Sequence, residues 1–332
     1  MFREKIIDTV FSNPAHSIGI NQSKCLRMRF NKSTCNKCRG ICYAQAVTIG
    51  EGLSIKSETC SGCMLCVSSC PSDCFTINSF DFYSLIARLK KIQVPVLGCS
   101  TRMNLDAHEK TFCLGFLSEE HIIALSALAQ RSLQINLTEC AGCGNEFVAD
   151  VLKKRLKSVE TKTSINIFER IRLVQNRPDL NYREISYDRR DFFRAIKNFT
   201  AQKTADLFDN MAANDNVTSY SLKKLPFKRD LLNRAFSSFS KELQEALLKN
   251  YYYTVGIDES CNYCFACVGM CPTGALKISR EESVSGLLFN CSLCIGCRLC
   301  ENFCMNNSIR VVDGFCGDEP FEFRNAEEGV LC

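Results

Sequence analysis

The chain has 332 residues, of which 46% are hydrophobic and 23% are charged, and its formal net charge is +5. These proportions indicate a folded protein of roughly two to four domains. No stretch approaches the roughly eighteen consecutive apolar residues of a membrane-spanning helix, and the N-terminus lacks the apolar core of a signal peptide, so we expect a cytoplasmic protein without a membrane span.

Cysteine is the outlier in the composition, with 24 residues. A secreted disulfide scaffold can reach this density, but such a scaffold is short and does not group its cysteines two residues apart. Thiols stay reduced in the cytoplasm, and metal ligation is the role that grouped thiols favour there.

Residues 1–80 form the first expected domain, and its second half carries a complete cysteine run. The run reads Cys60-x2-Cys63-x2-Cys66-x3-Cys70-Pro71. Three thiols at this spacing let one tight loop wrap an iron–sulfur cluster, and the fourth lies on a segment that leads towards a neighbouring cluster.

An incomplete run lies upstream of the complete one. It reads Cys35-x2-Cys38-x3-Cys42, with Lys32 at the position of the missing first cysteine. Cys25, ten residues before Cys35, is the expected substitute. The basic loop between them would raise the potential of a cluster that it covers. The alternative is that Cys25 is a buried free cysteine beside a cluster held by three thiolates.

Residues 81–180 show a different pattern, in which helices and strands alternate. The segments are a helix at 80–91, a strand at 94–98, a helix after Ser118, a strand at 133–137, a helix at 145–156 and a strand at 164–168. Elements of these lengths in this order predict a small α/β unit with parallel strands.

Four more thiols follow the strands of this unit. Cys99, Cys140 and Cys143 come after strand ends, and Cys113 lies in the loop that enters a helix. Because ligands collect beyond the carboxyl ends of parallel strands, all four can meet at one edge. Three interpretations stay open: a metal site holding zinc or a [2Fe–2S] cluster, a redox dithiol formed by Cys140 and Cys143, and free cysteines. His108 is interpreted as a loop residue and not as a ligand.

Residues 181–250 are polar and predict helices. One helix opens at 188–193, a loop covers 212–219, and one or two helices with an apolar face span 227–248. Basic residues outnumber acidic ones between 150 and 203. This excess predicts either a solvated helical surface or a docking face for an acidic redox partner.

Residues 251–316 form the last expected domain and carry two complete runs. They read Cys261-x2-Cys264-x2-Cys267-x3-Cys271-Pro272 and Cys294-x2-Cys297-x2-Cys300-x3-Cys304. Cys291 could compete with Cys294, but the spacing to Cys304 favours Cys294. Residues 317–332 include five acidic residues and predict a loose or partner-bound tail.

A short β segment follows each of the four cysteine runs, so the chain contains a fourfold internal repeat with two repeats in each terminal domain. The segments are 46–49, 75–77, 275–278 and 309–312.

Both terminal domains resemble bacterial-type ferredoxins with two [4Fe–4S] clusters, and the whole chain resembles a polyferredoxin, over residues 25–80 and 251–312. The resemblance implies an α+β fold in which two ferredoxin-like dicluster domains flank the small α/β unit and the helical segment. It implies four [4Fe–4S] clusters and these ligand sets: Cys25, Cys35, Cys38 with Cys70; Cys60, Cys63, Cys66 with Cys42; Cys261, Cys264, Cys267 with Cys304; and Cys294, Cys297, Cys300 with Cys271.

The formal charge changes once the ligands are counted as thiolates. Four clusters of about −2 each would turn +5 into about −3, so we expect no nucleic-acid partner.

Electron transfer is the function that these features predict. The chain has no G-x-G-x-x-G dinucleotide loop, P-loop or H-E-x-x-H motif. We therefore expect an electron carrier, or an electron-transfer subunit of an oxidoreductase, that serves a partner such as a flavoprotein or a hydrogenase-like enzyme. The alternative is an oxidoreductase whose active site is the central group of Cys99, Cys113, Cys140 and Cys143.

Overall fold

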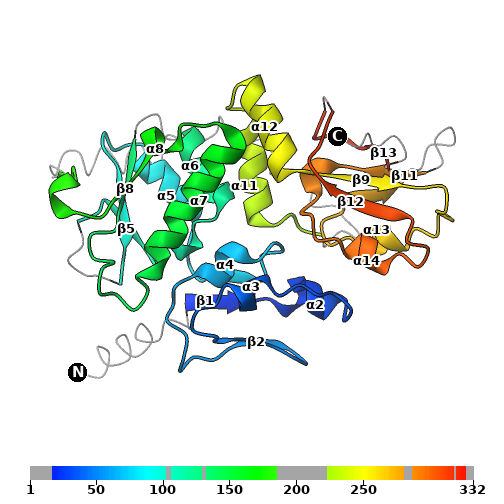
Figure 1. The fold of residues 1–332 in the computed structure, drawn as a ribbon, viewed down its shortest axis with the longest axis horizontal. Helices are drawn as coiled ribbons and strands as arrows, with labels where there is room; N and C mark the ends of the chain where they lie inside the picture. Colours follow the sequence, from blue (N-terminus) through cyan, green and yellow to red (C-terminus); the bar gives the residue numbers. More distant parts are fainter. Residues whose placement is uncertain are drawn as a thin grey trace, which may run out of the picture.

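The computed structural model shows an N-terminal domain (blue in Figure 1), a central unit (cyan to green) and a C-terminal domain (orange to red). The mixed α+β class expected from the sequence is confirmed. None of the helices in the described part of the chain is long and apolar enough to span a membrane. The residues that the structure describes are 17–101, 106–128, 132–184, 223–279, 286–317 and 319–326.

The N-terminal domain consists of two antiparallel strand pairs joined by short helices. Strand β1 (Ile18–Ile20) pairs with β4 (Phe75–Ile77), which brings the two ends of the domain together. Strands β2 (Val47–Ile49) and β3 (Leu53–Ile55) form a hairpin. Both strands expected after the cysteine runs are confirmed, as β2 and β4. The helices are η2 (Gln22–Lys24), α2 (Leu26–Arg29), α3 (Lys37–Gly40) and α4 (Leu65–Ser69).

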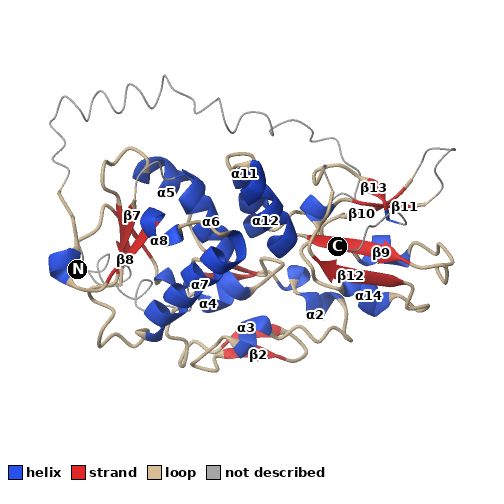
Figure 2. Cartoon of the chain, turned by 45° about the horizontal axis from the view of Figure 1, so that its top comes forward, coloured by secondary structure: helices blue, strands red, loops and turns tan. Residues whose placement is uncertain are grey.

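The C-terminal domain repeats this arrangement. Strand β9 (Tyr253–Ile257) pairs with β12 (Ile309–Asp313), side by side in Figure 2, and β10 (Leu276–Ile278) pairs with β11 (Leu287–Phe289). Strands β10 and β12 confirm the segments expected after the runs. The helices are α13 (Ala266–Met270), η7 (Cys291–Leu293) and α14 (Leu299–Phe303).

The tail is only partly described, and its described part does not match the expectation of a loose segment. Strand β13 (Arg324–Asn325) pairs with β11 and extends the sheet to three strands. The reason is that β11 has a free edge on the side away from β10, and a short strand satisfies its backbone groups there.

The central unit contains a four-stranded parallel sheet, as expected, in the order β6-β5-β7-β8. Apolar residues of the first helix, Phe82, Leu85, Ile86 and Leu89, form its buried face. The strands are β5 (Val96–Cys99), β6 (Glu109–Thr111), β7 (Leu133–Asn136) and β8 (Ile171–Val174). The helices are α5 (Phe82–Leu89), η3 (Leu114–Phe116), α6 (Glu119–Leu128), α7 (Phe147–Thr163), α8 (Ile167–Arg170) and η4 (Arg177–Asp179).

Two details of the central unit differ from the sequence prediction. The strand expected at 164–168 is wrong, because α7 continues to Thr163 and ends at the left-handed Ser164. The buried Ile165 and Ile167 fill the connection to α8, and the strand follows as β8. Strand β6 was not predicted, because this polar edge strand lacks the apolar pattern of a buried one.

Helices α11 (Phe227–Phe236) and α12 (Lys241–Tyr251) confirm the helices expected within 227–248. Their apolar faces are buried, and the Asn233 side chain of α11 donates a hydrogen bond to the Ser292 carbonyl of the C-terminal domain (2.9 Å). Helix α11 also packs against α6, so it connects the central unit with the C-terminal domain. The helix and the loop expected at 188–193 and 212–219 lie outside the described residues.

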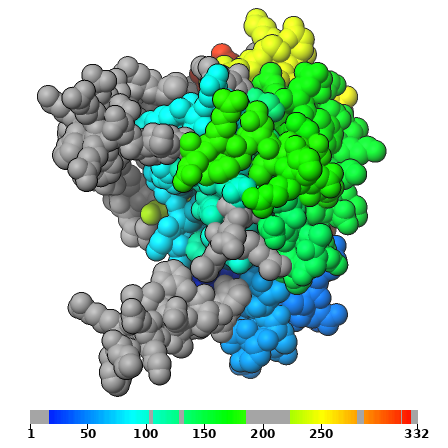
Figure 3. Space-filling model, turned by 90° about the vertical axis from the view of Figure 1, so that its left-hand side faces the viewer, coloured from blue at the N-terminus to red at the C-terminus, as the bar shows by residue number. Residues whose placement is uncertain are grey.

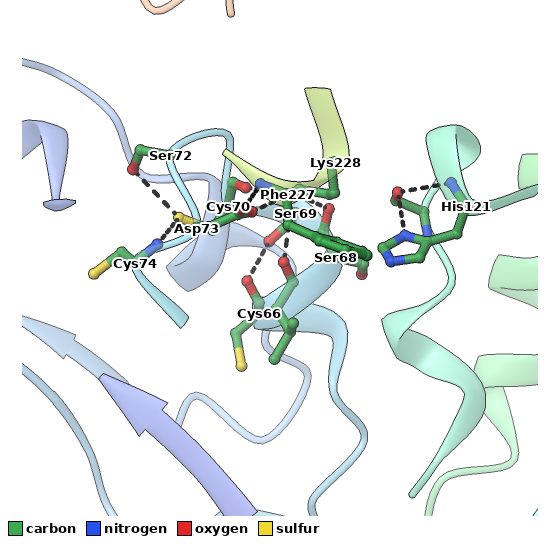
Figure 4. Close-up of polar contacts among 12 residues, drawn as sticks. Cys66, Ser68, Ser69, Cys70, Ser72, Asp73, Cys74, His121, Phe227 and Lys228 are labelled. Atoms are coloured by element: carbon green, nitrogen blue, oxygen red, sulfur yellow. Dashed lines mark hydrogen bonds and ion pairs between the residues drawn. The ribbon is translucent and has the colours of Figure 1, made fainter. Parts of the chain in front are cut away.

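The first turn of α11 is anchored in the N-terminal domain by a buried ion pair (Figure 4). The Lys228 ammonium donates hydrogen bonds to the carbonyls of Ser68 (2.8 Å) and Cys70, and it lies 4.0 Å from the Asp73 carboxylate. Asp73 in turn accepts a hydrogen bond from the Phe227 amide. Because the last carbonyls of α4 lack partners within the helix, Lys228 satisfies them and complements their negative dipole end.

His121 of α6 lies beside this anchor in an aromatic cage. Its ring contacts the rings of Phe82, Phe116 and Phe227, and its Nδ1 lies 2.8 Å from the Ser118 hydroxyl. Burial lowers the pKa of His121 to about 3, with Glu120 opposing the shift and Lys228 and Arg155 adding to it. The imidazole is therefore neutral in the folded protein at ordinary pH.

Replacing the anchoring lysine should destabilise the folded protein. Lys228→Met leaves the Asp73 carboxylate buried without its cation, and we expect a loss of about 3–5 kcal/mol in the free energy of unfolding. The matched control is Lys241→Met at the exposed start of α12, with a change within about 0.5 kcal/mol. Denaturant unfolding, carried out without oxygen, measures the free energy of unfolding of both variants. Equal losses of stability in the two would contradict the anchoring role of Lys228.

His121 should make the protein sensitive to acid. Its pKa is depressed in the folded state, so the unfolded state takes up the proton first, and stability falls as pH drops from about 6.5 towards 3 by up to about 1.4 kcal/mol per pH unit. The variant His121→Gln should lose this part of the slope between pH 7 and 5. The partly buried His108→Gln is the control. If the pH dependence of stability were unchanged in His121→Gln, His121 would not be the source of the acid sensitivity.

Candidate metal centres

The first predicted thiol set lies around one hollow of the N-terminal domain. Burial raises the pKa of the Cys38 thiol to about 11, and the charges of the other three thiols add to that shift. Cys70 reaches this hollow from the other cysteine run. This is the predicted crossed pattern, in which the last cysteine of each run belongs to the thiol set of the other run. The thiols that line the hollow are Cys25, Cys35, Cys38, Cys70 and, in addition, Cys74.

The second predicted set lies together in the same way. Burial raises the pKa of Cys66, and the nearby charges of Cys63, Cys60 and Cys42 act in the same direction. Cys42 therefore joins the run that begins at Cys60, while Cys70 of that run joins the first set.

The C-terminal domain brings Cys271 to the run that begins at Cys294. Burial raises the pKa of Cys300, and the charges of Cys294, Cys297 and Cys271 add to it.

The remaining set is more open. Burial raises the pKa of Cys267 to about 11, together with the charges of Cys261 and Cys264. Cys304 lies on the loop beside them, where the Asn306 side chain donates a hydrogen bond to the Ser260 carbonyl (3.2 Å).

The loops between the clustered cysteines share an uncommon backbone conformation. Within three runs, the residue before the second cysteine and the residue after it have positive φ: Gly62 and Met64, Tyr263 and Phe265, Gly296 and Arg298. A left-handed conformation costs a residue other than glycine about 1–2 kcal/mol. Alternation of this kind forms a nest of peptide N–H groups that favours an anion. Burial raises the pKa of Cys63, Cys294 and Cys297, and N–H groups of these loops oppose that shift. In the incomplete run, Asn36 has a φ of −136° and the nest is absent.

A second backbone feature occurs after all four runs. The residue three places after the last cysteine is left-handed in each repeat, and these residues are Gln45, Asp73, Gly274 and Asn307. In the N-terminal domain the next amide donates to the cysteine sulfur: Ala46 N to Cys42 Sγ (3.3 Å) and Cys74 N to Cys70 Sγ (3.3 Å). The internal repeat thus extends to the backbone.

The turn that leads into Cys25 matches the turn that leads into Cys294. Before Cys25, the Asn21 side chain accepts hydrogen bonds from the Ser23 amide (3.1 Å) and hydroxyl (2.7 Å). Before Cys294, the side chain of Asn290 forms the same pair with Ser292, at 2.9 and 2.7 Å. Each turn follows a strand, β1 or β11. The shared Asn-x-Ser-x-Cys pattern is a sequence signal for this position, and α2 begins the insertion that separates Cys25 from the rest of its run.

Two cysteines outside the predicted sets have distinct surroundings. Cys74 lies between Cys25 and Cys70, and its thiol lowers the pKa of Cys70 to about 5 and that of Cys25 to about 6. The spacing of the runs gave no reason to expect Cys74 there. The buried Cys291 donates a hydrogen bond to the Pro320 carbonyl (3.1 Å), which joins η7 to the C-terminal segment.

The four central thiols also share a small hollow at the carboxyl edge of the parallel sheet. Cys99 ends β5, Cys113 follows β6, and Cys140 and Cys143 follow β7. Burial raises the pKa of Cys113 to about 12, and the charges of Cys99, Cys63 and Cys140 add to that shift. His108 does not line this hollow; its Nδ1 accepts the Val96 amide (3.1 Å).

The donor groups of all five sets fit iron–sulfur chemistry. Each set is made of thiols alone, most of them are buried or half-buried, and peptide N–H groups face many of the sulfurs. Burial raises the pKa of many of these thiols, and a bound metal would supply the positive charge that their thiolate forms lack. In the described ranges, no three His, Cys, Asp or Glu side chains are arranged to hold one metal ion; the thiols of the first N-terminal set and of the central set surround hollows.

Comparison with known proteins gives no assignment for this chain. No family model, no curated protein and no solved structure matches it.

Proposed function

We propose that the chain is an iron–sulfur electron-transfer protein of the polyferredoxin type, with four [4Fe–4S] clusters on the four crossed thiol sets of its terminal domains. The observation that carries this proposal is the repeated backbone around the sulfurs. A left-handed residue follows every run, and a strained N–H nest lies in three of the four loops. Residues kept in a costly conformation at equivalent places point to a common anionic group there.

Contacts between the domains suggest an order for the proposed clusters. The Phe30 ring, five residues after Cys25, packs edge-on against Phe303, with centroids 5.3 Å apart. Phe303 ends α14, the helix that contains Cys300 of the set with Cys294. Burial raises the pKa of Cys297, and the charge of Arg29 opposes that shift, so Arg29 lies near this thiol. The set with Cys294 therefore faces the set with Cys25, and the crossed Cys42 and Cys70 join that set to the one with Cys60. Electrons would pass along the chain in this order or its reverse.

When bound, the clusters supply the one-electron chemistry, and the chain tunes their potentials. Lys228 is a buried cation within hydrogen-bond distance of the carbonyls of Ser68 and Cys70, between two thiol sets. Arg229 likewise lowers the pKa of Cys294 against the effect of burial. Positive charge at these places favours the reduced, more negative clusters.

The partner that we propose is an acidic redox protein, such as a flavoprotein or a hydrogenase-like enzyme, met in the cytoplasm. A hollow of about 720 Å³ lies beside Cys42, and its lining includes Arg27, Arg39 and Lys56. Charges of one sign around a half-buried ligand such as Cys42 favour a partner surface of the opposite sign and speed its encounter.

Metal analysis tests the proposal. The full chain, purified without oxygen, should contain about sixteen irons and as many sulfides in its terminal domains, and dithionite should reduce them reversibly. Iron, sulfide and zinc are quantified together on one sample. Protein that binds zinc alone after reconstitution with iron and sulfide would refute electron transfer as its function.

The match between the turns before Cys25 and Cys294 leads to a separate prediction. Cys25→Ala should lose the first cluster, which lowers the iron content by up to about four per chain. The matched control is Cys74→Ala, which removes a buried thiol from the same hollow and should leave the iron content unchanged. If Cys25→Ala keeps its iron and Cys74→Ala does not, Cys74 is the ligand; if both keep it, three thiolates suffice.

A further inference from the structure

The central unit rests directly on the N-terminal domain, as Figure 3 shows in green and blue. One point of close contact is Gly115 of η3. A methyl group added to Gly115 would lie 2.0 Å from the Cys63 carbonyl oxygen and 3.2 Å from the Leu65 side chain. Only a residue without a side chain fits there, so the backbone of the central unit touches the backbone of a predicted ligand loop.

Buried hydrogen bonds hold this contact in place. The Ser68 hydroxyl of α4 donates to the Gly115 carbonyl (2.7 Å), and Arg155 of α7 donates to the same carbonyl (3.0 Å). Arg155 also donates to the Leu117 carbonyl (2.7 Å) and to the Ser68 hydroxyl (2.9 Å). Removing the Arg155 side chain would take a donor from both carbonyls and from the Ser68 hydroxyl, so the network resists separation of the two surfaces.

Two further contacts join the same surfaces around the central thiols. The Asn145 side chain, two residues after Cys143, donates to the Ser61 carbonyl (2.9 Å). The ring of Phe147 stacks on Tyr43, next to Cys42, with centroids 4.2 Å apart. The N-terminal loops that make these contacts therefore carry ligands of one set only, the set of Cys42, Cys60, Cys63 and Cys66.

The thiols on the two sides come close at this interface. Cys113 precedes Gly115 by two residues and lines the hollow with Cys99, Cys140 and Cys143. Across the contact, Cys63 lies near enough for its charge to affect the Cys113 thiol. The edge where the central thiols meet is thus the edge that faces the N-terminal domain.

We propose that the central thiols hold an iron–sulfur cluster that exchanges single electrons with the cluster on the Cys42 set, across the contact between Gly115 and Cys63. This inference rests on the proposed function. One electron leaves the cubane, which is oxidised, and enters the central cluster, which is reduced; thiolate ligation does not change. A one-electron reductant such as dithionite supplies the electron.

The placement distinguishes this role from a structural metal site. A structural zinc stabilises the loops that bind it and needs no contact with a redox centre. Here one edge of the sheet collects four thiols, and the same edge is held against the ligand loop of Cys63 by Gly115, Asn145 and Arg155. The central centre would be the end of the relay opposite to the C-terminal domain.

Metal content and magnetic coupling provide the first test, on the full chain reconstituted without oxygen. The wild-type protein should hold about two irons more than the double variant Cys140→Ser/Cys143→Ser, beside about sixteen in the cubanes. In partly reduced samples, the electron paramagnetic resonance signal of one cubane should be broadened by the central spin, and the double variant should lose this broadening. About one zinc with sixteen irons would overturn the inference but leave the proposed function standing; absence of iron would refute both.

Electron-transfer rates provide the second test, with a matched pair of glycines. Gly115→Ala must push η3 away from Cys63, and we expect electron transfer to the central centre to slow by about tenfold or more. Gly144→Ala is the control, since a methyl group there meets nothing within 4 Å although it lies next to Cys143. The protein is mixed rapidly with dithionite, and the rate of reduction of the central cluster is followed from its absorption spectrum. Equal rates in the two variants, with full iron content, would overturn the route. If Gly115→Ala does not fold, the comparison of the wild type with Cys140→Ser/Cys143→Ser decides: broadening that persists in that double variant would overturn the inference.

Discussion

In both terminal domains, cysteines from the two runs approach each other, and the rest of the domain is arranged to keep them there. In the N-terminal domain Cys70 lies with Cys25, Cys35 and Cys38, while Cys42 lies with the run that begins at Cys60. The two runs must therefore be held at a constant separation. The strand pairs β1–β4 and β2–β3 do this, because each pair joins backbone from one half of the domain to backbone from the other or closes the turn between them.

The backbone close to the sulfurs is strained, and the same strain recurs at equivalent positions of several loops. Met64, Phe265 and Arg298 take a left-handed backbone in equivalent loops, although none of them is glycine. Conformational strain of this kind persists only where surrounding interactions determine it. The incomplete run lacks the nest and has its first thiol displaced to Cys25, so its surroundings differ most from those of the other three.

The same residues that hold the units together also lie closest to the predicted clusters. Lys228 neutralises the carboxyl end of α4 between two thiol sets, and Arg155 satisfies the Gly115 carbonyl beside a third. A buried cation with several carbonyl partners has little freedom to move, so it acts as a fixed charge. Packing of α11 and α7 against the N-terminal domain would thus set both the rigidity of the proposed relay and the electrostatic field at its proposed centres.

Local features of this protein could be predicted from sequence, because they depend on residues a few places apart. The cysteine spacing predicts the loops, the buried face of α5 follows from its apolar period, and the parallel sheet follows from alternating segments. The sequence did not predict the polar edge strand β6, because β6 lacks the apolar pattern of a buried strand. It placed the last strand at 164–168 and not at β8, because α7 continues to Thr163 and α8 follows it. The contacts of Lys228 with Cys70, of Cys74 with the predicted ligands Cys25 and Cys70, and of Gly115 with Cys63 join segments that packing brings together. Only the tertiary structure could decide them, because no local pattern records which distant surfaces a folded chain presses together.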